Sequence, residues 1–297
     1  RALSFSDGEF HNEAVADLKI AIEQRPEDQR MARTYGMHFV DYFPHRELGI
    51  SYYRMGDLKA AQGELELSIG QYPSSKARFY LDRVRKALIE KEGGEVKPPR
   101  LILDLQNGEI WTRDDPVMIS GVAEDERYVA GVSIMGTSLF LEQAQAKVPF
   151  KKDLRLPQGR HEVAVEARNL LGKKASRSVV VRVDREGPVI TVEKIEEDPA
   201  SPGGNTVITG SVYDEAGLGQ VRVNNEEIPS IGGVEASFRQ RIPKARKQLE
   251  IVAKDRLGNE TSATIPVDLS GKGNPSIRMA LAGSGQIPLV LAASAGK

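Results

Sequence analysis

The sequence predicts a multidomain protein, α then β, in which a helical domain precedes two β-sandwiches. Over residues 1–93 the apolar positions recur three and four apart among helix-favouring Ala, Leu, Glu, Lys and Arg. From about residue 100, Val and Ile alternate with polar residues, and glycine turns interrupt them. The β part also repeats itself at an interval near 89 residues, which indicates two copies of one domain.

Breaks in these patterns give the domain limits. The segment EGGEVKPPR, residues 92–100, contains Gly-Gly and Pro-Pro pairs that fit neither a helix interior nor a central strand. The predicted parts are a helical domain, two sandwiches and a flexible tail or linker rich in Gly, Ala and Ser: residues 1–96, 97–185, 186–270 and 271–297.

A repeat organises the helical part. Its positions are Leu48, Gly49, Tyr52, Gly56, Ala61, Leu65, Ser68 and Pro73, and a partial earlier copy runs from Gly8 to Pro26. The small residues allow two helices to approach closely, the large ones fill the space between them, and proline ends the second helix. This pattern resembles the tetratricopeptide (TPR) repeat, which implies stacked helical hairpins with a ligand groove.

The two prolines Pro26 and Pro73 are 47 residues apart, whereas an uninterrupted repeat places them 34 apart. About 13 extra residues therefore fall within 27–43. We predict an additional or lengthened helix there that ends before Pro44. Its inner face, mostly packed in the core, is expected to carry Met31, Tyr35, His38, Phe39 and Tyr42.

Two of the four histidines lie in or beside this segment. His38 and His45 are seven residues apart across a proline, with no cysteine or further histidine nearby, so no zinc site is predicted. His45 is expected to cap the repeat helix, to hydrogen-bond at its start, or to line the groove.

The groove is the predicted binding surface for a protein partner. The candidate contact residues are Tyr35, His38, Tyr42, Arg46, Tyr53 and Arg54. No catalytic residue and no cofactor is predicted. The glycine-rich stretches lack the context of a phosphate-binding loop, and no serine lies in a GxSxG motif.

The duplication in the β part is visible residue by residue. The pairs Gly121/Gly210, Asp125/Asp214 and Val132/Val221 are each 89 apart. Two domains of this size, each with about seven short strands and no cysteine, resemble immunoglobulin-like (Ig-like) sandwiches. The hairpin AKDRLGNETS in the second copy is similar to the last hairpin of bacterial Ig-like modules.

Oxygen-bearing side chains gather near the loops of the second sandwich. Asp255 is expected to bond the amides of its own turn, and this structural role is the first interpretation. Calcium binding is the alternative, through Asp214, Glu215, Asp255 and Asn259. The interdomain segment VDREGP supplies only two carboxylates toward such a site.

Composition excludes several classes of function. With 41 basic and 42 acidic residues, the chain as a whole offers no nucleic-acid or anionic-membrane surface. It has no cysteine, hence no thiolate chemistry, and its longest apolar run, IPLVLAASA, is too short for a transmembrane segment. The first residue is Arg1, so we expect a processed chain or a fragment.

The combined layout resembles extracytoplasmic proteins of Gram-negative bacteria in which TPR repeats precede Ig-like modules. The resemblance implies the periplasm, the outer-membrane surface or secretion. It favours a non-catalytic scaffold or adaptor, with the Ig-like domains as spacer or second binding face. The alternatives are a structural subunit of a filament or coat, self-associating through sheet edges or the tail, and the regulatory N-terminal part of a larger enzyme or lipoprotein.

Overall fold

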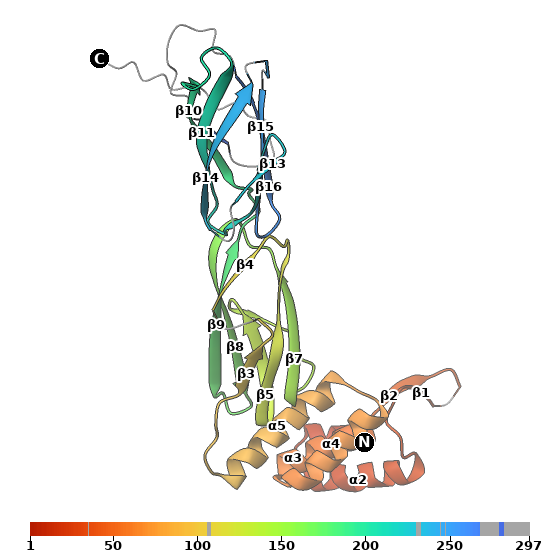
Figure 1. Cartoon of the computed structure of the whole chain (residues 1–297). Coiled ribbons are helices and arrows are strands. Elements are labelled where there is room, and N and C mark those ends of the chain that lie inside the picture. The colour runs from red at the N-terminus through yellow and green to blue at the C-terminus, as the bar shows by residue number, and fades with distance from the viewer. Residues whose placement is uncertain are drawn as a thin grey trace. The chain divides into compact units, whose positions relative to one another are not determined.

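The computed structural model describes residues 1–34, 36–105, 108–229, 233–243, 245–246, 248–267 and 279–281. It is 46% strand and 25% helix. The helices are α1 (Ala2–Asp7), α2 (His11–Gln24), α3 (Pro44–Met55), α4 (Leu58–Gln71) and α5 (Ser75–Glu92) (Figure 1). No described helix combines the length and the apolarity needed to cross a bilayer.

The fold class expected from the sequence, TPR-like hairpins followed by two Ig-like sandwiches, is wrong for the chain as a whole. Strand predominates over helix, and the helices do not form a compact unit of their own. Residues 1–106, 119–152 and 163–178 form one unit, and residues 107–118, 153–162 and 179–297 form the other. The helices thus share a unit with part of the first β domain.

Helix α5 explains why the helices are not separate. The Asp82 carboxylate accepts a hydrogen bond from the backbone N–H of Ala144, at 3.2 Å. The Arg85 guanidinium lies 4.4 Å from the ring centroid of Tyr128 and donates to the Ala144 carbonyl. The repeat pattern concerns spacing within the helices, and it does not reveal that one face of α5 packs against residues of the first β domain.

The helix predicted within residues 27–43 is also wrong, because this segment is a β-hairpin. Its strands are β1 (Gln29–Arg33) and β2 (Phe39–Tyr42). Gly36 has a φ of +65°, and the β-branched and aromatic residues around it favour strand over helix. Met31, His38 and Phe39 are exposed rather than packed in a core, Tyr42 is half-buried, and Tyr35 lies outside the described residues.

The predicted close approach of α3 and α4 is confirmed. A Cβ atom on Gly49 would lie 2.7 Å from Cγ of Leu65 and 3.1 Å from the carbonyl oxygen of Ala61. Around this contact the helices bury an apolar cluster made of Ile50, Ala61, Leu65, Ala77, Leu81 and Val84. The identity of Gly49 therefore sets how near the two helices can pack.

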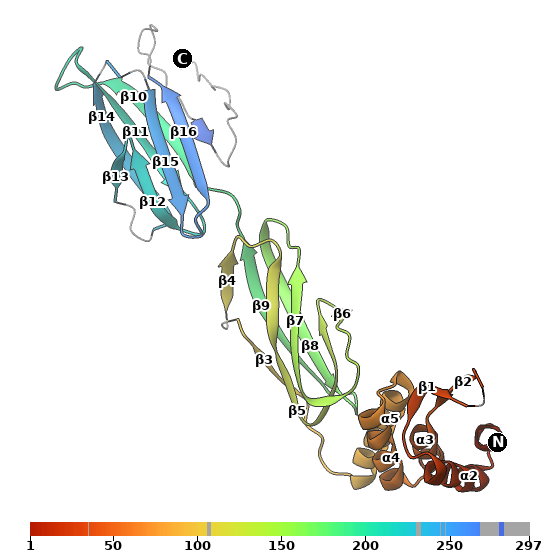
Figure 2. The ribbon, with the colours of Figure 1, turned by 90° about the vertical axis from the view of Figure 1, so that its right-hand side faces the viewer.

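The first β domain is one sheet that folds over itself. Its strands are β3 (Arg100–Leu103), β4 (Glu109–Thr112), β5 (Val117–Ile134), β6 (Thr137–Ser138), β7 (Gln145–Leu154), β8 (Gly159–Asn169) and β9 (Lys174–Val183). They follow the order β3-β5-β8-β9-β4, and β6 and β7 also pair with β5. The long strand β5 pairs with β3 in its first half and with β8 in its second half (Figure 2).

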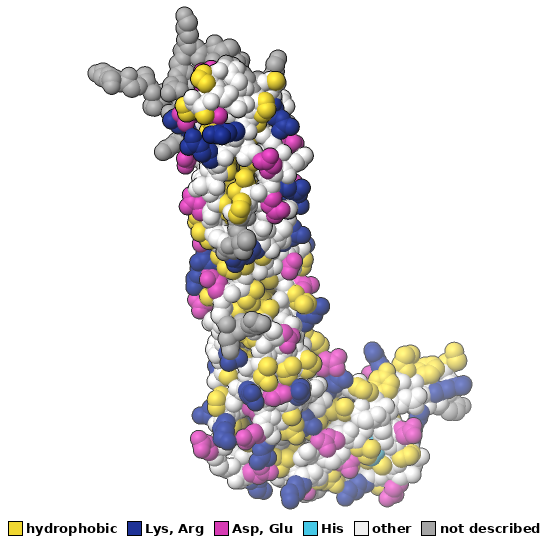
Figure 3. Space-filling view, in the orientation of Figure 1, with side chains coloured by type: hydrophobic (Ala, Val, Ile, Leu, Met, Phe, Trp, Pro, Cys, Tyr) yellow, Lys and Arg dark blue, Asp and Glu magenta, His cyan; other side chains and the backbone are white. Residues whose placement is uncertain are grey.

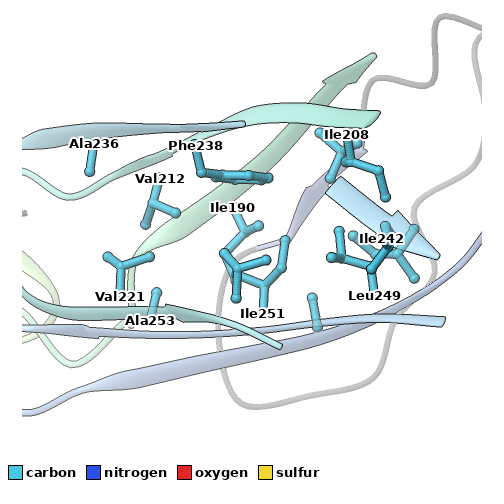
Figure 4. Packing of buried hydrophobic residues seen from close by; sticks show 14 of the residues in the cluster. Ile190, Ile208, Val212, Val221, Ala236, Phe238, Ile242, Leu249, Ile251 and Ala253 are labelled. Carbon is cyan, nitrogen blue, oxygen red and sulfur yellow. The ribbon is translucent and has the colours of Figure 1, made fainter. Parts of the chain in front are cut away.

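The second β domain is a sandwich of two four-stranded sheets with Ig-like strand order. The sheets are β14-β11-β10-β17 and β13-β12-β15-β16. The strands are β10 (Val189–Glu197), β11 (Asn205–Tyr213), β12 (Leu218–Val223), β13 (Glu226–Ile228), β14 (Glu235–Pro243), β15 (Gln248–Asp255), β16 (Glu260–Pro266) and β17 (Met279–Leu281). Alternate residues of both sheets point inward and form the core, which includes Ile190, Ile208, Phe238 and Ile251 (Figure 4). Apart from β17, the predicted tail at 271–297 lies outside the described residues.

The internal duplication has a packing counterpart. At Gly121 a Cβ atom would meet the carbonyl oxygen of Ile102 and, at 2.9 Å, the ring of Phe150. At Gly210 it would meet the carbonyl oxygen of Thr191 and, at 2.5 Å, the ring of Phe238. In both copies, glycine allows a phenylalanine to lie across the strand.

These glycines can be tested by adding a single methyl group. We expect Gly210→Ala, and likewise Gly121→Ala, to lower the free energy of unfolding by about 1–3 kcal/mol, because the methyl group overlaps backbone that cannot rotate away. Gly63→Ala is the control. Gly63 lies in α4, and a Cβ atom there would have no neighbour within 4 Å. This substitution should therefore raise the free energy of unfolding by about 0.5–1 kcal/mol. Urea unfolding of the three variants measures this, and unchanged stability of Gly210→Ala would contradict the packing argument.

A second test concerns the start of α3, which has no side-chain cap of its own. The buried Asp28 carboxylate accepts hydrogen bonds from the N–H groups of His45, at 2.9 Å, and Arg46, at 3.2 Å. Asp28→Ala should therefore lower stability by about 1–2 kcal/mol. The exposed neighbour provides the control Glu27→Ala, which should change little in the same thermal unfolding measurement.

Candidate functional site

Three buried aspartates converge in the second compact unit. Asp184 follows β9, Asp214 follows β11, and Asp255 is the last residue of β15. One carboxylate oxygen of each lies within 4.8 Å of the others. We call these three residues the aspartate cluster. Like charges this close repel one another, so the arrangement needs hydrogen bonds, a proton or a cation to balance it.

Each carboxylate of the cluster accepts local hydrogen bonds. Asp184 accepts from the side-chain amide of Gln158, at 2.7 Å. Asp214 accepts from the N–H of Ala216, at 2.8 Å. Asp255 accepts from both the backbone N–H and the side-chain amide of Asn259, each at 2.7 Å. The predicted structural role of Asp255 in its turn is therefore confirmed.

Within the aspartate cluster, Asp214 has a raised pKa. Burial raises the pKa of this carboxyl to about 6, and the nearby charges of Asp184 and Asp255 act in the same direction. The hydrogen bond from Ala216 acts against this rise. The side chain thus holds a proton in a pH range where an ordinary aspartate is ionised.

At the equivalent position of the first β domain, an amide rather than a second carboxylate lies beside the aspartate. There Asp125 is the counterpart of Asp214, and Asn169, 86 residues before Asp255, takes the place of that aspartate. The Asn169 amide donates to the Asp125 carboxylate at 3.2 Å. An amide–carboxylate hydrogen bond in the first repeat is therefore replaced by a pair of carboxylates in the second.

The structure places only some of the calcium-ligand candidates expected from the sequence close to one another. Asp214, Asp255 and Asn259 lie at the cluster, and the side chain of Glu215 instead accepts from Arg182 at 2.6 Å. Sequence analysis missed Asp184 as a member, although the segment VDREGP contains it. Calcium takes six to eight oxygen ligands, and the cluster offers carboxylates of the right type. Calcium binding stays the alternative to the structural role.

The predicted groove residues have mostly internal partners. The Tyr42 hydroxyl donates to the carbonyl of Ala21, at 2.7 Å. The ring of Tyr53 packs edge-on against Tyr80, with centroids 6.0 Å apart. These two tyrosines support the helices of the first unit.

The remaining groove candidates are divided between α3 and the hairpin. Arg46 lies 4.0 Å from the ring centroid of Phe43, and Arg54 donates to the Ser6 carbonyl at 2.9 Å. His38 is exposed on the hairpin. Partner binding by these residues stays a prediction.

His45 is buried and hydrogen-bonded through both ring nitrogens. Nδ1 lies 2.6 Å from the Glu64 carboxylate, and Nε2 lies 2.8 Å from the Pro26 carbonyl. The predicted hydrogen bonding of His45 at the start of the repeat helix is therefore confirmed.

A hollow of about 770 Å³ lies in the first compact unit, where β5, β6 and β8 meet. We call it the Phe140 groove. It is lined by residues that include Leu139, Phe140, Leu141, Glu166, Arg168 and Lys174. Phe140 is 88% exposed. Sequence analysis missed this site, although the apolar run of residues 139–141 just after a glycine turn was a usable signal.

The rim of the Phe140 groove is charged. Lys174 forms an ion pair with Glu166 at 2.9 Å, so these two charges balance. Arg168 is exposed and forms no ion pair with any described residue. An apolar surface beside one unbalanced positive charge can bind an apolar segment that carries a carboxylate.

Comparison with known proteins gives only weak likenesses. No protein-family model and no curated protein matches the chain. Among solved structures, a Bacteroides ovatus mixed-linkage glucan utilization locus protein, SGBP-B, with a bound mixed-linkage heptasaccharide is 16% identical, with a TM-score of 0.22. The match covers 58% of this chain and 48% of that one.

Two further structures illustrate the range of matches. The ectodomain of human desmocollin-1 is 15% identical, with 59% of this chain and 37% of that chain covered and a TM-score of 0.28. The fibronectin(III)-like modules of Clostridium thermocellum CbhA are 16% identical, with 59% and 99% covered and a TM-score of 0.28. The chain thus spans less than half of the first two proteins, and these TM-scores carry no argument about function.

The aspartate cluster gives a pH-dependent prediction. The folded state binds a proton at Asp214 up to a pH of about 6, whereas the unfolded state loses it near pH 4. This group therefore makes the wild type less stable as the pH rises from 4 through 6. We expect Asp214→Asn, measured in chelator, to raise the unfolding midpoint at pH 7–8 by about 2–4 °C, with a smaller gain below pH 5.

The matched control lies in the first repeat. Both Asp125 carboxylate oxygens accept hydrogen bonds, one from the backbone of Arg127 and Tyr128 and one from the Asn169 amide. Asp125→Asn replaces one of these oxygens by an NH2 group that cannot accept, so it should give no gain at any pH. A midpoint of Asp214→Asn that falls at pH 7–8 in chelator would contradict the repulsion argument. The calcium alternative makes its own prediction: added calcium should raise the midpoint of the wild type and not that of Asp214→Asn.

Proposed function

We propose that the chain is a non-catalytic binding protein that works outside the cytoplasm and binds a protein partner through its first β domain. The observation that carries the proposal is the Phe140 groove, in which a large aromatic side chain stands 88% exposed beside a hollow. Burying an apolar side chain of this size releases free energy, and an exposed phenylalanine does not contribute it to the fold. A partner that covers the ring gains this free energy on binding.

The chemistry of the groove indicates what the partner presents. Leu139, Phe140 and Leu141 give an apolar centre, and charged residues lie at the edge, as in protein–protein interfaces. With Lys174 and Glu166 paired to each other, Arg168 supplies the net charge. The partner segment is therefore apolar and carries an acidic residue that meets Arg168.

Two further observations support this function. Each carboxylate of the aspartate cluster accepts a hydrogen bond from a backbone N–H of its own turn, which suits a structural role better than acid–base catalysis. The chain has no cysteine, which fits an oxidising compartment. The second β domain, with its closed core, then serves as spacer or second binding face.

Site-specific photocrosslinking tests the proposal. A photoreactive residue placed at Ser138 in the full chain should capture one major protein from the envelope fraction of the source cells. With that partner purified, Phe140→Ala and Arg168→Glu should each weaken binding about tenfold or more, because each removes a central contact. Calorimetry or surface plasmon resonance measures the loss.

The control is Phe79→Ala, which truncates an exposed phenylalanine on α5 outside the groove and should leave the affinity unchanged. A partner that binds both groove variants as tightly as the wild type would refute the assignment of the groove. Crosslinks that join mainly copies of this chain would replace the proposal with the structural-subunit alternative.

A further inference from the structure

The β1–β2 hairpin leaves apolar side chains in solvent. Figure 3 shows hydrophobic side chains gathered where the hairpin extends from the helices. Their exposed fractions are large: 63% for Met31, 83% for Met37, 48% for Phe39 and 46% for Val40. The only described residue buried in either strand is Ala32. These side chains are thus available for contacts that the chain itself does not make.

The apolar residues occupy both faces of the hairpin. Phe39 and Val40 are consecutive in β2, so their side chains point to opposite faces, and both are exposed. The face of Val40 also carries its strand partner Ala32, which is buried, and Tyr42, which bonds to α2, so this face is open only near the turn. There, an apolar medium around the turn covers both faces.

The β1 strand of the hairpin is poorly suited to pairing with a further strand. The carbonyl of Arg33 accepts a hydrogen bond from the Arg25 side chain, at 3.4 Å. The N–H of Met31 donates to the Asp41 carboxylate, at 3.3 Å, and Met31 has a φ of +54°, which interrupts the regular strand. Side chains of the chain itself thus satisfy backbone groups of β1, which disfavours strand addition. The side chains of the hairpin are what it offers to a partner.

Positive charge accompanies these apolar residues. Residues 29–40 contain Arg30, Arg33 and His38 and no acidic residue. The aspartates on either side of this segment are engaged within the chain, Asp28 with the N–H of His45 and Asp41 with the N–H of Met31. The long arginine side chains can reach phosphate groups while the neighbouring apolar side chains lie deeper.

We propose that the β1–β2 hairpin inserts into the headgroup region of an anionic lipid bilayer. Met31, Met37, Phe39 and Val40 lie at the boundary between headgroups and acyl chains, and Arg30 and Arg33 contact lipid phosphates. A two-stranded sheet has open edges whose backbone groups would be unsatisfied in hydrocarbon, so insertion stops at this interface. The contact is therefore shallow and reversible.

Vesicle flotation of the full chain tests this proposal. We expect the protein to float with vesicles of equal parts phosphatidylcholine and phosphatidylglycerol, more weakly in high salt, and little with phosphatidylcholine alone. Met37→Ser/Phe39→Ser should lower the partition coefficient roughly tenfold or more. Arg30→Gln should lower it roughly fivefold on the anionic vesicles.

The matched control is Met118→Ser/Phe79→Ser, which removes one methionine and one phenylalanine exposed elsewhere and should float like the wild type. Circular dichroism and the thermal midpoint verify that all variants are folded. The proposal is overturned if the wild type does not float, if the hairpin variant floats equally well, or if the control loses as much. Association between copies that depends on the hairpin and occurs without lipid would also overturn it, in favour of a protein interface.

Discussion

A strand carbonyl and a phenylalanine ring meet the backbone of Gly121, and the same arrangement recurs at Gly210. The β part depends on this contact, because the ring can fill the core only where the strand it crosses has no side chain. Strands β3 and β10 then pair directly with the glycine-bearing strands. Both copies of the β domain therefore keep the same contact between a glycine, a phenylalanine ring and a strand carbonyl, although most neighbouring residues differ.

The two repeats diverge where charge is involved. In the first, Asn169 donates to Asp125, so one amide balances one carboxylate. In the second, an aspartate takes the place of that asparagine, and Asp184 adds a third carboxylate. Burial then shifts the balance at Asp214 toward the protonated form. Where the first β copy has a closed amide–carboxylate hydrogen bond, the second has a group, Asp214, that responds to pH.

Local sequence predicted those features that depend on spacing within one element or one repeat. Gly49 is an example, because a small residue at this place in a helical repeat indicates close contact with the next helix. The hairpin was missed because Met31, His38 and Phe39 fit a helical spacing, while the decisive signals, Gly36 and the aromatic and β-branched residues around it, do not enter such a count. The docking of α5 through Asp82 and the capping of α3 by Asp28 join residues far apart in sequence, which no local pattern encodes.

The two proposed contact surfaces differ in a way that follows from their settings. Phe140 lies in the loop after β6, is 88% exposed, and stands beside a hollow that a shaped protein segment can fill. Phe39 stands on a two-stranded hairpin whose opposite face carries the exposed Val40. Near the turn, contact from one side would leave the apolar side chains of the other side in water. The setting of the apolar side chains, a hollow at Phe140 and a basic turn at the hairpin, therefore separates the site proposed for a protein from the site proposed for a lipid interface.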